Sequence, residues 1–396
     1  MIPKRFYNNV VVPGLNLISH PDLFFLKLRT PRKSWYRLIY HLQRTRFPKR
    51  VNYYPLHIDL EISKTCNQKC IMCFRMFDRF SGPEAIVPAR FHDHKTGPDF
   101  MDIELIRFLV PYLRLADGVN TLGLGEALLH PQFDKVIELL KQARVNVNIQ
   151  TNANLLTSQL LEFFAGQKVD SIMISLHGYS ATTIQAICPG ADPEKLFENL
   201  MHLKKLKQNK NLECPVLGFY YVAMKSNIKE LPDFLNMAAK VGAKFVVISH
   251  LVKFGPPIWQ ESLEDIQELT GEIFKKAEVL AKQQNIQLFF SYRSDYIKNG
   301  NICTDPWTTM HIHANNDVCP CGFSTRKMGN LHEHSIFEIW NSEPYQQLRS
   351  RMISCSKYPE CSSCLCFSRT SAPDNMVPAY NEFLDRKLSL EKAGFT

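Results

Sequence analysis

Cys66, Cys70 and Cys73 lie within eight consecutive residues, in the spacing Cys-x3-Cys-x2-Cys. Deprotonated thiols are ligands for soft metal ions and for iron–sulfur clusters. A closed structural zinc site takes four ligands, whereas a four-iron cluster held by three cysteines leaves one iron open to an external ligand. The number and spacing of these thiols therefore predict a cluster with one open coordination position.

Two other interpretations of the three thiols were weighed. A zinc ion would need a fourth ligand from elsewhere in the chain, and the spacing alone leaves this open. A disulfide framework is disfavoured, because the third thiol would stay unpaired and the first residues show no secretory signal pattern. The 12 cysteines of the chain thus favour a reducing, cytoplasmic environment, in which thiols serve metal binding or catalysis.

The segment before the cysteines has the pattern of a strand. Leu56, Ile58, Leu60 and Ile62 alternate with polar residues, which predicts one apolar and one polar face. Closed parallel barrels fill their interior with branched apolar side chains, so a polar face suggests a wide or open barrel. The cysteine loop would begin at the carboxyl end of this strand, where ligands gather in parallel α/β folds.

Strand-like and helix-like segments alternate after residue 100. Strands are expected near residues 119–123, 145–150, 170–176, 216–223 and 244–250, and helices near 102–115, 132–143, 156–166, 193–208, 228–241 and 262–284. With the first strand these make six βα units, which right-handed crossovers join into a parallel sheet. On this pattern alone a doubly wound sheet is nearly as good an interpretation as a barrel. Residues 74–99 are expected to form a long loop or lid.

The composition is that of an ordinary globular protein. Hydrophobic residues make up 45% and charged residues 21% of the 396 residues, and no apolar run is long enough to span a membrane. The net charge of +9 suits an anionic substrate, cofactor or partner, but does not by itself indicate nucleic acid.

Residues 1–54 form a basic N-terminal extension without a catalytic signature. From Arg29 to Arg50, Arg and Lys residues are interleaved with aromatic residues, which suggests a helix. We expect its aromatic side chains to pack on the body of the protein. Contact with a membrane surface or with nucleic acid is the alternative for the same stretch.

A second group of cysteines lies near the C-terminus, at a density that core packing does not explain. Its members are Cys303, Cys319, Cys321, Cys355, Cys361, Cys364 and Cys366. A hairpin is expected here, with a strand near residues 308–312, a turn at 315–317 and a return strand ending in cysteine. Asn315 and Asn316 suit such a turn, because Asn tolerates a left-handed backbone. A zinc ribbon made from these thiols is a competing interpretation.

The Cys-x3-Cys-x2-Cys pattern resembles the signature of the radical S-adenosylmethionine (radical SAM) enzymes. The resemblance implies a partial (β/α)6 TIM-like barrel and a [4Fe-4S] cluster on Cys66, Cys70 and Cys73, with SAM bound to the open iron. It also implies that an external donor such as flavodoxin or ferredoxin supplies the electron that cleaves SAM. The resulting 5'-deoxyadenosyl radical would abstract a hydrogen atom from a substrate C–H bond.

Three further stretches resemble segments with which that family binds SAM. Gly123-Leu124-Gly125-Glu126-Ala127 resembles a glycine-rich motif, in which Leu124 and Ala127 replace the usual Gly and Pro. Thr151-Asn152-Ala153-Asn154 and Ser175-Leu176-His177-Gly178 resemble turns after the third and fourth strands. Each could also be an ordinary turn that satisfies its own backbone. The SAM contacts implied by the resemblance are Met72, Gly123, Gly125, Glu126, Asn152 and Ser175.

The C-terminal cysteines resemble the SPASM domain, an extension that adds auxiliary iron–sulfur clusters to some radical SAM enzymes. Their spacing favours one auxiliary [4Fe-4S] cluster on Cys303, Cys321, Cys361 and Cys364, with Cys319 and Cys366 as rival ligands. Four cysteine ligands would close the cluster and suit it to electron transfer. The expected divisions of the chain are the extension 1–54, a core barrel 55–290, a small cysteine-rich SPASM-like domain 300–370 and a tail 371–396.

The expected activity is that of a radical SAM enzyme, with dehydrogenation, epimerisation and bond formation all open. Cys188 is a candidate hydrogen donor to a substrate radical, although a packed thiol is the simpler interpretation. The expected substrate is a sugar or other small molecule, or a peptide. Nucleic-acid base modification and a non-catalytic iron–sulfur or zinc scaffold are the alternatives, and a scaffold would release no 5'-deoxyadenosine.

Overall fold

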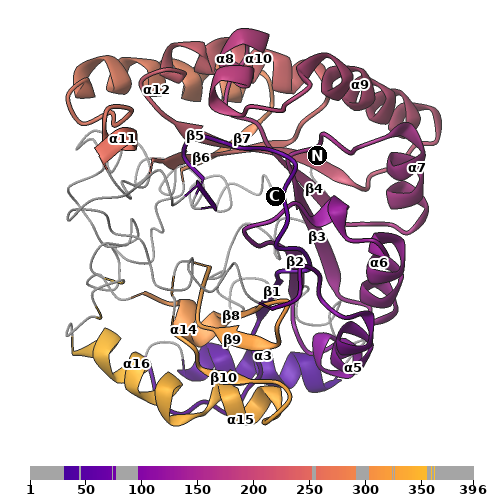
Figure 1. The fold of residues 1–396 in the computed structure, drawn as a ribbon, viewed down its shortest axis with the longest axis vertical. Coiled ribbons are helices and arrows are strands. Elements are labelled where there is room, and N and C mark those ends of the chain that lie inside the picture. The colour runs from indigo at the N-terminus through magenta and orange to yellow at the C-terminus, as the bar shows by residue number, and fades with distance from the viewer. Residues whose placement is uncertain are drawn as a thin grey trace, which may run out of the picture.

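The computed structural model describes residues 31–43, 46–73, 75–76, 97–251, 256–290, 303–322, 324, 326–354, 358 and 361. Its centre is one curved sheet of ten strands in the order β10-β9-β8-β1-β2-β3-β4-β5-β6-β7. From β8 to β7 all neighbours are parallel, whereas β9 and β10 are antiparallel. Figure 1 shows the helices around the outside of this sheet. Within the described residues β7 and β10 are the edges, so the barrel is open.

Seven parallel strands and their helices form the larger part of this fold. The strands are β1 (His57–Leu60), β2 (Gly118–Thr121), β3 (Asn146–Thr151), β4 (Ser171–Ser175), β5 (Val216–Ala223), β6 (Phe245–His250) and β7 (Gln287–Phe290). The helices are α5 (Ile103–Leu113), α6 (Phe133–Gln142), α7 (Ser158–Gly166), α8 (Ala181–Ile187), α9 (Pro193–Asn209), α10 (Leu231–Lys240), α11 (Pro256–Trp259) and α12 (Gln267–Gln283), with 3-10 turns η4 (Ala127–Leu129) and η5 (Ile228–Glu230). The expected strands and helices are confirmed. The strand β7 and the helix α8 were not expected.

Local chemistry explains where several helices begin. The side chains of Asp102, Thr157 and Ser180 cap α5, α7 and α8 by accepting hydrogen bonds from backbone N–H groups of the first turn. The helices then bury one apolar face; in α6, for example, Val136 and Leu140 are fully buried. Together with the apolar face of the strands, these side chains form the main hydrophobic core.

The opposite face of the sheet carries a row of polar side chains, as the alternating pattern of the first strand predicted. Ser171 donates to Asn148 at 2.8 Å, Asn148 donates to Asn120 at 2.9 Å, and Asn120 donates to Asp59 at 2.7 Å. These four residues, called the polar row below, are register partners on β4, β3, β2 and β1. Polar groups in the barrel interior are therefore satisfied by one another across the strands.

The C-terminal hairpin is part of the same sheet. It consists of β8 (Thr309–Ile312) and β9 (Asp317–Cys319), and is followed by β10 (Gly329–Asn330). Asn316 has a φ of +69° in its turn, which confirms the expected left-handed residue. β8 pairs with β1 in parallel, His57 opposite Thr309 and Leu60 opposite Ile312. This pairing joins segments about 250 residues apart and was not expected from the sequence.

The helix of the basic extension packs on the body of the protein. In α3 (Pro31–Gln43), Arg37 pairs with Asp117 at the start of β2, and the ring of Tyr36 lies 5.4 Å from that of Tyr54. These contacts support the packed helix over the membrane alternative for residues 31–43. Among the helices described, none combines the length and the apolar character that a membrane crossing needs. Residues 1–30, most of the expected loop 74–99 and the tail 371–396 lie outside the described residues.

A buried arginine joins the extension to the C-terminal helices α14 (Asp305–Thr308), α15 (Ile336–Trp340) and α16 (Glu343–Ile353). Arg349 is fully buried and donates to the carbonyls of Pro306 and Lys49, at 2.8 and 3.0 Å. Its guanidinium lies 4.6 Å from the centre of the Trp340 ring. Arg349 thus holds three separate segments with hydrogen bonds and a cation–π contact.

We expect Arg349→Ala to lower the free energy of unfolding by about 3 kcal/mol, because the buried carbonyl of Pro306 and the carbonyl of Lys49 lose their donor and the ring contact is lost. Urea denaturation measures this change. Arg107→Ala is the matched control, since Arg107 is 60% exposed and pairs only with a neighbour on its own helix. That control should change stability by about 0.5 kcal/mol or less. Equal losses in the two variants would contradict the assigned role.

Candidate active site

The cysteine loop begins directly after β1 and is held at both ends by backbone hydrogen bonds. Before the cysteines, the N–H of Lys64 donates to the carbonyl of Asp99 at 2.8 Å. Further along, the N–H groups of Lys69 and Ile71 donate to the carbonyls of Pro189 and Ile187, at 3.1 and 2.9 Å. The loop is therefore anchored to the last residue of α8 and to Pro189 just after this helix, which the sequence did not predict.

The three thiols of the loop lie close together in a partly buried setting. Burial raises the pKa of Cys66, and raises the pKa of Cys73 to about 12. A hydrogen bond with Cys188, together with burial, raises the pKa of Cys70. The neighbouring thiols Cys66 and Cys70 also act on the pKa of Cys73, so the three groups share one environment. A metal centre stabilises such thiols in their deprotonated form, and the three residues fit a cluster with one open iron.

The glycine-rich segment after β2 packs against the strand end that leads into the cysteine loop. A Cβ atom on Gly125 would lie 2.2 Å from the carbonyl oxygen of Ser63 and 2.6 Å from that of Thr65. The N–H of Glu126 donates to the same Thr65 carbonyl at 2.7 Å. Only glycine fits at position 125 without displacing this backbone.

The carboxylate of Glu126 connects two of the sequence-predicted stretches. It is buried, and accepts hydrogen bonds from the hydroxyl of Thr151 at 2.6 Å and from the N–H of Asn152 at 2.7 Å. A third bond comes from the N–H of Leu128 at 3.1 Å. Burial raises the pKa of Glu126, and these hydrogen bonds oppose the rise. The second and third strand ends are thereby held together.

Asn152 faces the cysteine loop. Its amide nitrogen donates to the side chain of Asn67 at 2.8 Å and contacts the sulfur of Cys66 at 3.6 Å. Its side-chain oxygen accepts from the N–H of Asn154 at 3.0 Å, which is an Asx turn. Ala153 has a φ of +63° in this turn, which lies in the left-handed region. Asn152 therefore forms an ordinary Asx turn and also contacts the cysteine loop, and its contact with SAM stays a prediction.

Glu61 and His313 form a buried pair that sequence reasoning did not single out. The carboxylate of Glu61 lies 2.6 Å from Nδ1 of His313, and its other oxygen accepts from the N–H of Leu124 at 2.9 Å. A Cβ on Gly123 would lie 2.4 Å from the Glu61 side chain. Burial opposes ionisation of Glu61, but the bond from His313 and further contacts hold its pKa below the usual range. The signal in the sequence was that Glu61, which directly follows β1, continues the alternation of polar and apolar residues of that strand.

The turn after β4 is locked by a neutral histidine. Nδ1 of His177 accepts from the N–H of Val222 at 3.0 Å, and complete burial lowers the pKa of His177 to about 3. In the same region, the hydroxyl of Ser175 accepts from the side chain of Gln150 at 3.3 Å. His177 thus joins the turn after β4 to the neighbouring strand β5.

Cys188 and Met72 belong to a small apolar cluster beside the cysteine loop. Cys188 is 3% exposed and packs with Ile187 and Met224, and Cys70 and Met72 lie against the same cluster. This packing favours the simpler interpretation of Cys188 as a buried thiol. Its role as a hydrogen donor stays a prediction.

Comparison with known families decides the identity of the fold and of its C-terminal extension. The model of the radical SAM superfamily matches residues 60–238, and that of SPASM, an iron–sulfur cluster-binding domain, matches residues 303–365. The chain is a radical SAM protein with a C-terminal SPASM domain. The SAM-binding [4Fe-4S] cluster, SAM itself and auxiliary iron–sulfur binding follow from this membership, as the sequence predicted.

Two curated relatives and one solved structure illustrate this family. The tungsten-containing aldehyde ferredoxin oxidoreductase cofactor-modifying protein of Pyrococcus furiosus is 23% identical over 342 residues, covering 78% of this chain and 86% of that protein. The antilisterial bacteriocin subtilosin biosynthesis protein AlbA of Bacillus subtilis is 22% identical over 300 residues, covering 73% of this chain and 60% of that protein. SuiB of Streptococcus suis, bound to the precursor peptide SuiA, has a TM-score of 0.60 at 15% identity, covering 87% of this chain and 78% of that chain. Its likeness confirms the partial TIM-like barrel.

The described part of the SPASM region contains four of its cysteines. The charges of Cys319 and Cys321 both act on the pKa of Tyr345, so these two thiols lie near that side chain. Cys303 and Cys361 are half-buried against the main core. Cys355, Cys364 and Cys366 lie outside the described residues. The ligand set of the auxiliary cluster therefore stays a prediction.

We expect Gly125→Ala to lower the free energy of unfolding by about 2 kcal/mol and to weaken SAM binding at least tenfold, because the added methyl group meets two carbonyl oxygens and displaces the strand end before Cys66. Urea denaturation and equilibrium dialysis with labelled SAM measure the two effects.

Gly166→Ala is the control for this substitution, since a Cβ at Gly166 has no atom within 4 Å. It should leave SAM binding unchanged and alter stability by about 1 kcal/mol or less. Unchanged SAM affinity in the Gly125 variant would show that the close approach at this position does not shape the site.

Proposed function

We propose that this radical SAM protein cleaves SAM reductively at a cluster held by Cys66, Cys70 and Cys73, and that it removes a hydrogen atom from a C–H bond of a peptide substrate. The observation that carries the proposal is the meeting of the glycine-rich segment and the Asn152 turn at the cysteine loop, through Gly125 and Glu126. When bound, the cluster and SAM supply the 5'-deoxyadenosyl radical. The residues of the protein then have to bind and orient SAM and the substrate, and to enclose both in the site.

Glu126 is the residue that we propose to receive the ammonium group of SAM. Its two carboxylate oxygens offer about four acceptor positions. Hydrogen bonds from Thr151, Leu128 and Asn152 use three of them. One position therefore remains for a charged donor, and a charge-assisted hydrogen bond is stronger in a buried site than in water.

The other predicted contacts receive different roles. The amide of Asn152 is engaged with Asn67 and Cys66, so we propose that it positions the cluster loop rather than binding the ribose. Ser175 accepts a hydrogen bond from Gln150, and its hydroxyl can still donate to SAM. Met72 lies at the apolar cluster, where its thioether suits contact with the adenine. Gly123 and Gly125 keep the backbone close to strand β1.

A peptide is the substrate that the relatives favour. The relative from Bacillus subtilis is named for bacteriocin biosynthesis, and the structure of SuiB contains a precursor peptide. An open barrel also suits a substrate larger than a closed barrel admits. A small molecule or cofactor is the second candidate, because the relative from Pyrococcus furiosus is named as a cofactor-modifying protein.

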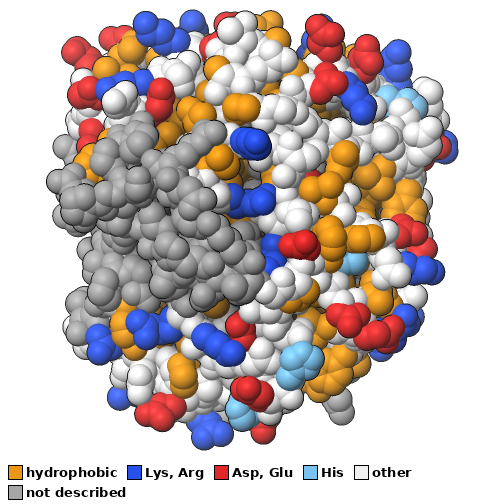
Figure 2. All heavy atoms as spheres, in the orientation of Figure 1, with side chains coloured by type: hydrophobic (Ala, Val, Ile, Leu, Met, Phe, Trp, Pro, Cys, Tyr) orange, Lys and Arg blue, Asp and Glu red, His pale blue; other side chains and the backbone are white. Residues whose placement is uncertain are grey.

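The nucleic-acid alternative receives no support from the described residues on the face drawn in Figure 2. Figure 2 shows basic and acidic side chains interspersed over the coloured part of one face. In the extension, Arg37 is paired with Asp117 and Tyr36 packs on Tyr54, so both side chains are engaged within the protein rather than directed at a nucleic acid.

For the auxiliary site we propose one [4Fe-4S] cluster on Cys303, Cys321, Cys361 and Cys364. We propose that it transfers electrons, and that a flavodoxin or ferredoxin is the external electron donor of the protein.

We expect the triple variant Cys66→Ala, Cys70→Ala, Cys73→Ala to release no 5'-deoxyadenosine from SAM under reducing conditions, while it keeps about four irons on the remaining cluster. Chromatography of the nucleoside, iron and sulfide analysis, and electron paramagnetic resonance measure these quantities after anaerobic reconstitution.

The control is Cys214→Ala, which removes a half-buried thiol outside both proposed clusters. It should keep both clusters and SAM cleavage. Release of 5'-deoxyadenosine by the triple variant would refute the assigned ligands. Loss of all iron, or zinc in its place, would refute the auxiliary cluster.

A further inference from the structure

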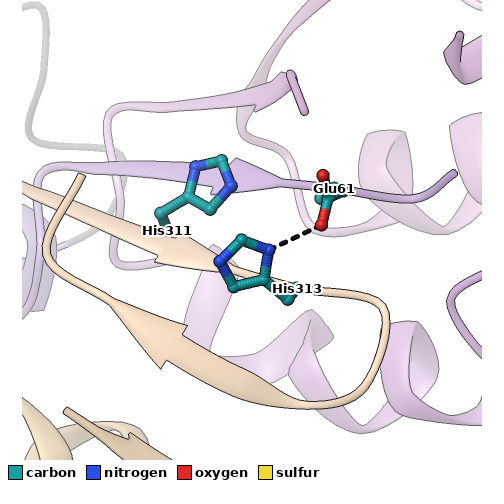
Figure 3. Close-up of side chains that lie close together, drawn as sticks. All are labelled: Glu61, His311 and His313. Carbon is teal, nitrogen blue, oxygen red and sulfur yellow. Dashed lines mark hydrogen bonds and ion pairs between the residues drawn. The ribbon is translucent and has the colours of Figure 1, made fainter. Parts of the chain in front are cut away.

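Two histidines and a glutamate meet inside the barrel, where β8 lies beside β1. Glu61 follows β1, His311 belongs to β8, and His313 follows β8. One ligand atom from each lies within 4.8 Å of the other two. Figure 3 shows both imidazole rings next to each other on the side of the sheet where Glu61 lies. Glu61 and His311 are each 2% exposed.

His311 is the unexplained member of this group. Both of its ring nitrogens are buried, and neither has a hydrogen-bond partner among the described residues. Burial of an imidazole whose nitrogens make no hydrogen bond is unfavourable, and such groups in folded proteins usually bind water or an ion. The buried nitrogens of His311 are therefore the observation that points to a ligand at this position.

One nitrogen of His311 already faces a carboxylate. Its Nδ1 lies 3.8 Å from Asp59, the last member of the polar row, whose other oxygen accepts from Asn120. Metal-binding histidines commonly direct one nitrogen at a carboxylate and the other at the ion. Asp59 thus suits the role of the outer carboxylate, which leaves Nε2 of His311 for coordination.

The side chain of Glu61 is also held in place by its neighbours. Its first oxygen is held by the N–H of Leu124, and the absence of a side chain on Gly123 makes room for it. Its second oxygen lies 2.6 Å from Nδ1 of His313. A carboxylate and an imidazole that share a proton can share a metal ion instead, because the ion replaces the proton between the same two lone pairs.

We propose that Glu61, His311 and His313 bind a divalent transition-metal ion of the zinc type. Two imidazoles and one carboxylate form a ligand set that suits zinc and related ions, whereas magnesium and calcium prefer oxygen ligands. Tetrahedral bonds of about 2.0 Å place two ligand atoms roughly 3.3 Å apart, so Glu61 and His313 need to separate only slightly. Three protein ligands leave a fourth position for water or another small ligand.

This site is chemically distinct from the iron–sulfur sites, because it contains nitrogen and oxygen ligands and no thiolate. It joins the SPASM hairpin to the first barrel strand, directly beneath the segment from Gly123 to Gly125. A bound ion would therefore couple the position of the hairpin to that of the glycine-rich segment. The inference does not depend on SAM cleavage.

Zinc uptake by the full-length protein tests the proposal. The protein is reconstituted anaerobically, and preparations that contain equal amounts of iron and sulfide are used. Each preparation is treated with a chelator and then dialysed against Zn²⁺. The bound metals are measured by mass spectrometry. We expect about one zinc ion per chain beyond the clusters. His311→Gln should bind zinc at least tenfold more weakly. His130→Gln should bind it like the wild type, because His130 is a buried histidine engaged with Met101 elsewhere.

Co²⁺ reports the ligand type in the same preparations. We expect the wild type and His130→Gln to show the visible absorption bands of bound Co²⁺, without the charge-transfer bands that thiolate ligands produce. The visible bands should be lost in Glu61→Gln. Zinc should raise the melting temperature of the wild type and not of the Glu61 variant, which keeps the test valid if His311→Gln folds poorly. The proposal would be overturned if the wild type took up no zinc, or if all variants took up equal amounts. Thiolate charge-transfer bands in the Co²⁺ spectrum would also overturn it.

Discussion

The parallel pairing of β8 with β1 is the constraint on which the rest of the structure depends. It brings His313 to Glu61 and His311 to Asp59, although the paired residues are about 250 positions apart. Glu61 in turn holds the N–H of Leu124, so the hairpin, the first strand and the glycine-rich segment form one connected unit. The SPASM region is therefore not a separate appendage on the barrel. It completes the wall beside the cysteine loop.

Two buried glutamates in neighbouring turns show how that unit sets its electrostatics. Glu126 is surrounded by neutral donors, so burial dominates and its pKa rises. Glu61 is buried to a similar degree, but His313 beside it keeps its pKa low. The two glutamates are thus suited to different tasks. Glu126 is a hydrogen-bond acceptor near the cysteines whose ionisation is opposed by burial, whereas Glu61 is an anion held between two strands.

The sequence predicted most of what depends on local patterns. The alternation around Ile58 predicted a strand with a polar face, and the cysteine spacing predicted the loop after it. The helix α8 was missed because its β-branched residues, such as Thr182 and Thr183, favour helices weakly. The strand β7 was missed because its four residues are too few for a clear period. The pairing of β8 with β1 depends on contacts across the whole chain, so no local pattern reveals His311 or His313 as partners of β1.

The antiparallel return of the hairpin has a consequence for electron transfer. Because β9 runs back along β8, Cys319 lies level with His311 and Asp59, whereas Cys66 follows the carboxyl end of β1. The chain after Cys319 continues away from that carboxyl end, so the proposed clusters on Cys321 and on Cys66 would lie at different levels along β1. Asp59 and His311 are paired at the level of Cys319, so a charge on either side chain would act on the redox potential of a cluster bound nearby.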